Sequence, residues 1–209
     1  LPRALRRQGV DIRLAIPLHG SIRRSDYDLT RLTSVEVPHS SGPIPAEVYS
    51  TQIDGLPVYL ISGPPFKPEE PVYSNNWGFD AHKYIFFSLA ALELARTFNS
   101  PPAILHANDW HTAAAVYWLA LNRPIDPFYS HTASLLTIHN LPYLGMDGGA
   151  PMTAFGLPPA RHAPLPDWAQ HLPLPLGLLT ADHVTAVSPT YAREILTPEF
   201  GSGLHEFLQ

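Results

Sequence analysis

The stretch AILHANDWHTAAAVYWLALN, residues 103–122, decides the fold. It begins with a short apolar run over residues 103–105, which is typical of a buried strand, and it continues through a polar run over residues 106–111. The alanine-rich remainder, residues 112–122, has high helix propensity and contains no glycine or proline. A buried strand that leads directly into a helix is the repeating unit of α/β proteins.

The same order of strand and helix recurs on the C-terminal side. Residues 135–138 and 184–187 are two further apolar strands, and residues 190–196 are predicted to form a helix. Ser188 is the expected N-cap of that helix, and Pro189 is its expected first residue. Strands that alternate with helices predict a Rossmann-like α/β fold, in which helices cover both faces of a parallel sheet.

The N-terminal half mixes helices with a hairpin. The dipeptide Asp54-Gly55 tolerates positive φ, so it predicts a tight hairpin between strands over residues 47–53 and 58–61. Gly9 is the expected end of a helix over residues 1–8. The other expected elements are a strand over 12–16 closed by Pro17, a short strand over 35–37, a proline-rich loop over 63–71, a helix over 84–98, and a structured loop with one helix over 145–175.

The composition excludes several classes of protein. Lysine and arginine number 13 against 18 aspartates and glutamates, a net charge of −5, so no global basic field attracts a nucleic-acid backbone. The chain has no cysteine, which excludes disulfides, thiolate metal sites and cysteine nucleophiles. No stretch reaches the roughly 18 apolar residues that a membrane span needs. We therefore expect neither nucleic acid nor membrane as a partner.

Three polar clusters follow the predicted strands, at residues 106–111, 139–140 and 188–190. The carboxyl ends of parallel strands meet at one edge of a sheet, where ligands of such proteins bind. A single buried histidine is more often a hydrogen-bonded core residue than a functional one, but three polar clusters on one rim favour a site.

Several chemistries are compatible with this rim. His106, Asp109, His111 and His139 offer nitrogen and oxygen ligands, but their spacing matches no standard metal motif. A Ser-His-Asp hydrolase is disfavoured because the sequence lacks the G-x-S-x-G nucleophile elbow. Carboxylate, imidazole, amide and indole groups together suit a polyhydroxylated ligand, since sugars need directional hydrogen bonds and an apolar surface.

The motifs also resemble a known family. The sequence carries HANDWH at residues 106–111, TIHNL at 137–141, and ADHVTAVSPTYAREI at 181–195, followed by TPEFG at 197–201. In this order they are similar to the bacterial glycogen synthases and plant starch synthases, as are LPRAL at residues 1–5 and the segment 80–94. The resemblance runs over essentially the whole chain.

The resemblance implies an activity and a domain organisation. Members of this family are retaining glucosyltransferases with two Rossmann-like domains, a fold called GT-B, and they move glucose from ADP-glucose to the non-reducing 4-hydroxyl of an α-1,4-glucan. They require no metal or other cofactor. By this resemblance residues 1–209 are the N-terminal, acceptor-side domain, incomplete at its N-terminus. The family's Lys-x-Gly-Gly-Leu turn and its C-terminal nucleotide-binding domain lie outside the chain.

The resemblance also assigns residues. His139 resembles the histidine that meets the transferred glucose and Asn140 its neighbour in the sugar site, while Asp109, Trp110 and His111 form the family's D-W-H motif near the sugars. Asp109 and His139 are thus the expected catalytic residues, and Tyr73 resembles a tyrosine on the acceptor side. From the sequence alone, Asp109 is equally suited to cap the helix that begins at Trp110. Ser188, Thr190 and Glu194 are expected only to cap and decorate their helix. Two positions depart from the family pattern: Pro175 stands where a lysine is usual, and Lys83 where an arginine is usual.

Two functions remain open at the level of sequence. The first is part of an ADP-glucose-dependent glycogen or starch synthase, inactive without its second domain because the cations that stabilise the leaving diphosphate lie there. The second is a non-catalytic carbohydrate-binding module that keeps the same rim. A bacterial cytoplasm is the expected location, ahead of a plastid, because no transit segment is visible.

Overall fold

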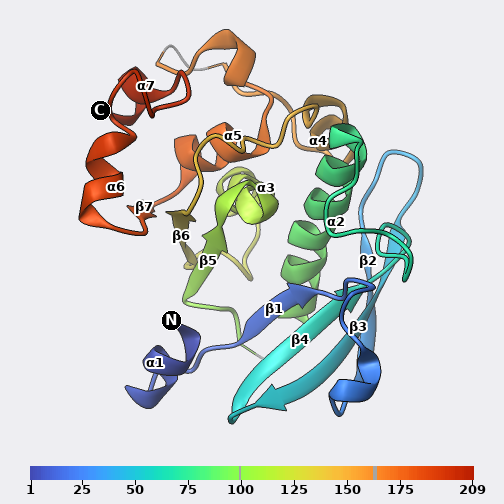
Figure 1. Ribbon diagram of the computed structural model, residues 1–209. Coiled ribbons are helices and arrows are strands. Elements are labelled where there is room, and N and C mark those ends of the chain that lie inside the picture. The colour runs from blue at the N-terminus through green and yellow to red at the C-terminus, as the bar shows by residue number, and fades with distance from the viewer. Residues whose placement is uncertain (99, 162–163) are drawn as a thin grey trace.

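The computed structural model describes residues 1–98, 100–161 and 164–209. Two sheets and the helices beside them share one main hydrophobic core (Figure 1). The elements, in chain order, are α1 (Pro2–Arg7), β1 (Leu14–Pro17), η1 (Arg24–Asp26), β2 (Thr30–Val37), β3 (Ile44–Ile53), β4 (Leu56–Ser62), α2 (Trp77–Arg96), β5 (Ile104–Asn108), α3 (Asp109–Asn122), β6 (Ala133–Ile138), α4 (Gly149–Ala154), η2 (Asp167–Ala169), α5 (Pro173–Thr180), β7 (His183–Ala186), α6 (Pro189–Glu194) and α7 (His205–Leu208).

The C-terminal sheet confirms the expected α/β organisation. Strands β5, β6 and β7 pair in parallel in that order, and Asn108 is aligned with Thr137, which is aligned with Thr185. Helix α3 packs on β5 and β6, and α5 packs on α3. The expectation that helices cover both faces is wrong for this sheet, because on the face opposite α3 the side chains of Ile104, His183 and Thr185 are exposed.

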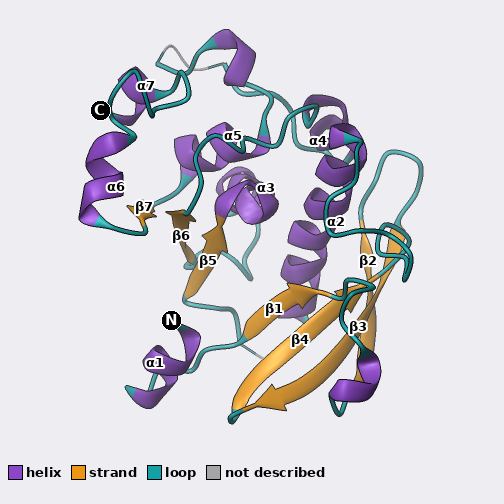
Figure 2. Cartoon of the chain, viewed as in Figure 1, coloured by secondary structure: helices purple, strands orange, loops and turns teal. Residues whose placement is uncertain are grey.

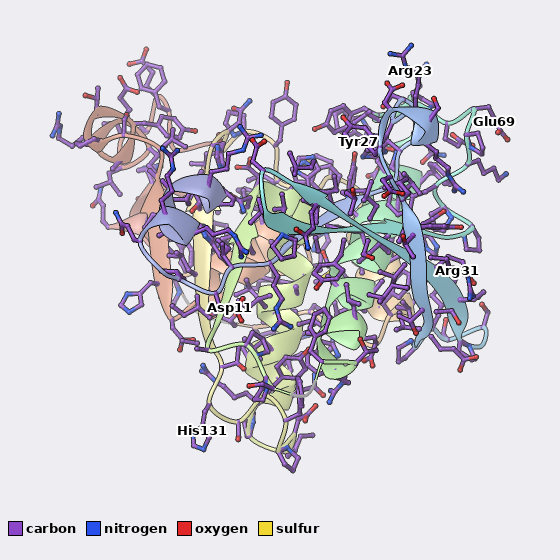
Figure 3. All side chains as sticks on the ribbon, turned by 90° about the horizontal axis from the view of Figure 1, so that it is seen from below. Asp11, Arg23, Tyr27, Arg31, Glu69 and His131 are labelled. Atoms are coloured by element: carbon purple, nitrogen blue, oxygen red, sulfur yellow. The ribbon has the colours of Figure 1, made fainter. Side chains whose placement is uncertain are left out.

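The N-terminal strands form a separate sheet, with the order β1-β4-β3-β2 (Figure 2). In this sheet β1 and β4 pair in parallel. The β2–β3 and β3–β4 pairs are antiparallel, and the β3–β4 pair is the expected hairpin. Asp54 has φ of 52° and Gly55 has φ of 76°, the left-handed pair that a two-residue hairpin turn needs. The expected hairpin is therefore confirmed, whereas the strand expected over residues 35–37 extends back to Thr30. Around this N-terminal sheet the side chains of Arg23, Arg31 and Glu69 point outward (Figure 3). His131 lies away from the sheet, at the lower edge of the same view.

Helix α2 is longer than the sequence predicts. It begins at Trp77 rather than at residue 84, because the side chain of Asn76 caps it by accepting a hydrogen bond from the Phe79 N–H at 2.9 Å. It lies between the N-terminal sheet and α3, so residues on nearly all its sides are buried. Phe98 falls beyond its end.

The segment 145–175 holds more helix than expected. It contains α4, η2 and the start of α5, and residues 162 and 163 lie outside the described part. Pro173 and Pro175 both stand in the first turn of α5, where the N–H groups that proline lacks have no helical acceptor. Further along α5, a Cβ on Gly177 would lie 2.8 Å from the Cβ of Ala113, so this glycine lets α5 approach α3 closely.

Candidate functional site

The rim forms where β5 and β6 end side by side. Asp109 follows β5 directly, and His139 and Asn140 follow β6. Because the two strands are parallel and in register, these three residues lie at the same edge of the sheet. The structure thus brings together the first two polar clusters of the sequence.

Asp109 ties the two strand ends together. Its Oδ1 accepts hydrogen bonds from the backbone N–H of His139, at 2.6 Å, and of Asn140, at 3.2 Å. Its backbone has φ of 55°, a left-handed conformation that costs a residue other than glycine roughly 1–3 kcal/mol. Aspartate tolerates this conformation better than most residues, and the carboxylate repays part of the strain by holding the backbone that carries His139.

The expectation that Asp109 caps its own helix is wrong. The N-cap of α3 is Asn108, and the hydroxyl of Thr112 bonds both the N–H and the carbonyl of Asn108, at 2.5 and 2.9 Å. The carboxylate of Asp109 instead reaches across to the next strand. This long-range contact has no signature in the local sequence.

His139 is exposed and oriented by Asn108. The His139 Nε2 lies 3.0 Å from the Asn108 Oδ1. An amide oxygen only accepts, so Nε2 is the donor in this contact. Asn108 was part of the polar run that the sequence singled out, but its role in orienting His139 was not foreseen.

Tyr73 and His111 form the second half of the rim. The hydroxyl of Tyr73 lies 2.9 Å from the Nε2 of His111. Burial, partly opposed by Asp109, lowers the pKa of His111 to about 4, so its ring is neutral near pH 7. Burial raises the pKa of Tyr73, and the nearby Asp109 adds to this, so the phenol stays protonated. The ring of Tyr73 is nonetheless 56% exposed and available to a ligand.

Trp110 lies in the core rather than on the surface. Its side chain is 3% exposed, and its ring centroid lies 4.3 Å from that of His111 and 5.1 Å from that of Tyr84. A Cβ on Gly145 would come within 3.1 Å of the indole, so the loop at residue 145 covers it. This geometry therefore gives no support to a direct contact between Trp110 and a sugar. The indole instead packs against the ring of His111.

In the third polar cluster, the expected Ser188 cap is confirmed. Ser188 caps α6 by accepting a hydrogen bond from the Tyr191 N–H at 3.0 Å. The sequence did not single out Tyr191, whose hydroxyl accepts from the Leu141 N–H at 2.8 Å and so attaches α6 to the segment after Asn140.

The histidines and carboxylates of the rim do not converge on one point. His106 Nε2 lies 2.7 Å from the hydroxyl of Thr137, whereas Asp109 contacts backbone groups. Within the described ranges, no three histidine, aspartate or glutamate side chains are grouped to hold a metal ion.

The rim suits a sugar. It presents imidazole, amide and phenol groups that donate and accept hydrogen bonds, and Tyr143 adds a second aromatic ring that is 51% exposed. A hollow of about 770 Å³ lies elsewhere, lined by Ser40, Thr153, Arg161, Asp167, His171 and neighbouring residues, and it includes none of the rim residues. The described part of the chain contains no helix that is long and apolar enough to cross a membrane.

Fold and rim together define an α/β domain with a polar, sugar-compatible site at the carboxyl ends of its parallel strands. The sequence model of the starch synthase catalytic domain matches residues 1–209, so the chain belongs to that family. The glycogen synthase of Geotalea daltonii is 32% identical over 98% of this chain and 43% of its own length. That of Vibrio parahaemolyticus is 35% identical over 97% of this chain and 42% of its own length.

A solved structure agrees with the assignment. The catalytic domain of starch synthase IV from Arabidopsis thaliana, bound to ADP and acarbose, superimposes with a TM-score of 0.81 at 27% identity, covering 99% of this chain and 44% of that one. The fold is therefore the N-terminal half of a GT-B glycosyltransferase. The chain spans less than half the length of the relatives it matches.

Proposed function

We propose that this chain is the acceptor-side half of a retaining glucosyltransferase, which moves glucose from ADP-glucose to the non-reducing 4-hydroxyl of an α-1,4-glucan. The observation that carries the proposal is the rim itself. An exposed histidine is held on a backbone fixed by Asp109, and an exposed tyrosine is hydrogen-bonded to a neutral His111. Membership of the starch synthase family supports the choice of reaction, and the Arabidopsis relative bound to ADP and acarbose supports the choice of ligands.

The proposed roles follow from exposure. His139 and Asn140 are exposed and bond hydroxyls of the transferred glucose. Tyr73 offers a ring face and a hydroxyl to the acceptor glucan, with His111 fixing its orientation. Asp109 acts through the backbone of His139 and Asn140, so we assign it a positioning role at the catalytic site.

The chemistry needs a second set of groups. Transfer with retention develops positive charge on the glucose and negative charge on the departing diphosphate, so positioned dipoles and charges lower the barrier. The rim residues named above include no lysine or arginine, and Lys83 of α2 is buried against Asp80. We therefore propose that the cations for the diphosphate come from a C-terminal nucleotide-binding domain.

Two further points belong to the proposal. The glycogen synthase relatives are bacterial, and a bacterial cytoplasm is the proposed location. The alternative function is a carbohydrate-binding module without catalysis, which the same rim would serve. Reading the gene on both sides of this segment separates the two, because only the enzyme requires an in-frame Lys-x-Gly-Gly-Leu turn and a second Rossmann domain.

The direct test uses ADP-[14C]glucose and glycogen. We expect the chain alone to bind glycogen in affinity electrophoresis without incorporating label, and we expect incorporation once it is joined to a nucleotide-binding domain. His139→Ala in the joined protein is the control for contaminating synthase. Robust incorporation by the chain alone would contradict the two-domain account, and glycogen binding without any incorporation by the joined protein would favour the binding module.

A further inference from the structure

A fully buried ion pair lies beneath the segment that carries Tyr73. The side chains of Lys83 and Asp80, one turn apart on α2, are 0% and 1% exposed, and the Lys83 Nζ lies 2.8 Å from the Asp80 Oδ1. Removing two charges from water is costly, and apolar side chains of similar volume would fill the same space without that cost. The pair therefore needs an explanation other than stability.

Both members of the pair bind the backbone on either side of Tyr73. The ammonium group of Lys83 donates to the carbonyl of Val72 at 2.8 Å and to that of Pro71 at 3.2 Å. Asp80 Oδ2 accepts from the N–H of Ser74 at 2.8 Å. Lys83 thus donates to two backbone carbonyls and pairs with Asp80 by charge, while Asp80 Oδ1 itself accepts no hydrogen bond within the described residues.

The next residue of the helix adds a third contact. The hydroxyl of Tyr84 donates to the carbonyl of Val72 at 2.7 Å. Positions 80, 83 and 84 lie on one face of a helix, so this face holds the backbone on both sides of Tyr73. Tyr73 itself is largely exposed; its side chain bonds His111 and its ring lies near those of His111 and Tyr84, whereas its backbone is held from α2.

We propose that the Lys83–Asp80 pair positions Tyr73 over His111 and so sets the affinity of the rim for the acceptor glucan. The pair touches no substrate and acts only through the backbone of residues 71–74. This inference rests on the proposed function. It gives a role to Lys83, which the family resemblance marked only as a lysine at a position where arginine is usual.

The decisive variant removes the whole pair, Lys83→Met with Asp80→Leu, because removing one partner would leave a buried charge unpaired. We expect the chain to stay folded, the Ser74 amide to exchange with solvent at least about tenfold faster, and the affinity for maltoheptaose to fall about tenfold. Lys83→Arg keeps the charge and the donors and is expected to retain most of the affinity. The control removes a partly exposed ion pair that holds no residue near Tyr73, Arg123→Met with Asp182→Leu, and should leave the affinity unchanged.

Tyr73→Ala completes the cycle. If the pair acts through Tyr73, adding the double substitution to Tyr73→Ala causes no further loss of affinity. Full additivity, unchanged affinity of the double variant, or unchanged exchange at Ser74 would each overturn the proposal. If that pair variant does not fold, Lys83→Met with Asp80→Asn removes both charges and the two bonds that Lys83 donates, and unchanged affinity in this second variant would also overturn the proposal. A wild-type chain that binds no maltoheptaose contradicts the proposed function instead, and the exchange at Ser74 still decides whether the pair holds the loop.

Discussion

At the scale of single residues, Asp109 shows how a strained conformation serves a site. Its left-handed backbone turns the carboxylate away from its own helix and toward the N–H groups of His139 and Asn140. The sequence identified all three residues as members of one rim, because the ends of parallel strands meet. It gave no sign of the bond between them, since that contact joins residues thirty positions apart.

Substitutions at Asp109 separate its contribution to stability from its contribution to activity. Asp109→Ala removes both accepted hydrogen bonds and places an alanine at positive φ, so we expect a loss of about 2–3 kcal/mol in the free energy of unfolding. Asp109→Asn keeps an oxygen acceptor and tolerates the same φ, so the fold should survive with lower activity. Urea denaturation of both variants measures this, and equal losses for alanine and asparagine would contradict it.

His139 is the residue whose loss should affect activity without affecting stability. Its side chain is exposed and bonds only to Asn108 among the contacts described above, so His139→Ala should change the free energy of unfolding by less than about 0.5 kcal/mol. In a synthase that combines this chain with a nucleotide-binding domain, we expect turnover to fall by about 10²-fold or more. A stable and fully active His139→Ala enzyme would remove His139 from the catalytic site.

His111 makes the stability of the chain depend on pH. Its pKa is about 4 in the folded chain and near 6.5 when unfolded, so the unfolded chain binds more protons between these values. Stability should therefore decline as the pH falls from about 6.5 to about 4, and burial of His19, His82 and His106 acts in the same direction. Asp109, Asp80, Lys83 and His19 are the charged or titratable groups that act on the His111 ring.

The variant His111→Gln provides the comparison, because its amide still reaches Tyr73 but does not titrate. We expect urea unfolding at pH 7, 6 and 5 to show a shallower decline for His111→Gln than for the wild type. Identical slopes would mean that His111 is not buried in neutral form.

At the scale of secondary-structure elements, the sequence predicted those whose signals are local. The strand and helix that follow residue 103, the hairpin at Asp54-Gly55 and the Ser188 cap are set by periodicity, turn chemistry and capping. The sequence did not predict helix α5, because Pro173, Pro175 and Gly177 are residue types that favour loops. The two prolines are compatible with a helix because they stand in its first turn. The glycine is needed because α3 lies too close to leave room for a side chain.

Two helical glycines offer a matched test of this packing. A Cβ on Gly78 in α2 would meet its nearest neighbour at 3.5 Å, so Gly78→Ala should stabilise the chain by about 0.5 kcal/mol through helix propensity. A Cβ on Gly177 would lie within 3.2 Å of three atoms of Ala113, two of them backbone, so Gly177→Ala should destabilise by about 1–3 kcal/mol. Thermal melts of the two variants should shift in opposite directions, and a shift in the same direction would contradict the close packing of α5 on α3.

At the scale of the whole molecule, the proposed function makes this chain one half of a two-part active site. Its polar rim combines residues from β5, β6, the segment before α2 and the first turn of α3, and the core beneath them is continuous. The family and the fold were predictable because their motifs are long and ordered. The Lys83–Asp80 pair under Tyr73 and the burial of Trp110 were not predictable. Neither the way residues 71–74 fold back on α2 nor the cover of Trp110 by the loop at Gly145 has a pattern in the local sequence.

Whether this rim binds glucan can be measured by an NMR titration of the isotope-labelled chain with maltoheptaose. We expect saturable NMR shift changes confined to residues around His139, Asn140, Tyr73 and His111, strongly weakened by Tyr73→Ala. Shift changes that cluster instead around Thr153, Arg161 and His171, or the absence of binding at millimolar maltoheptaose, would contradict the account.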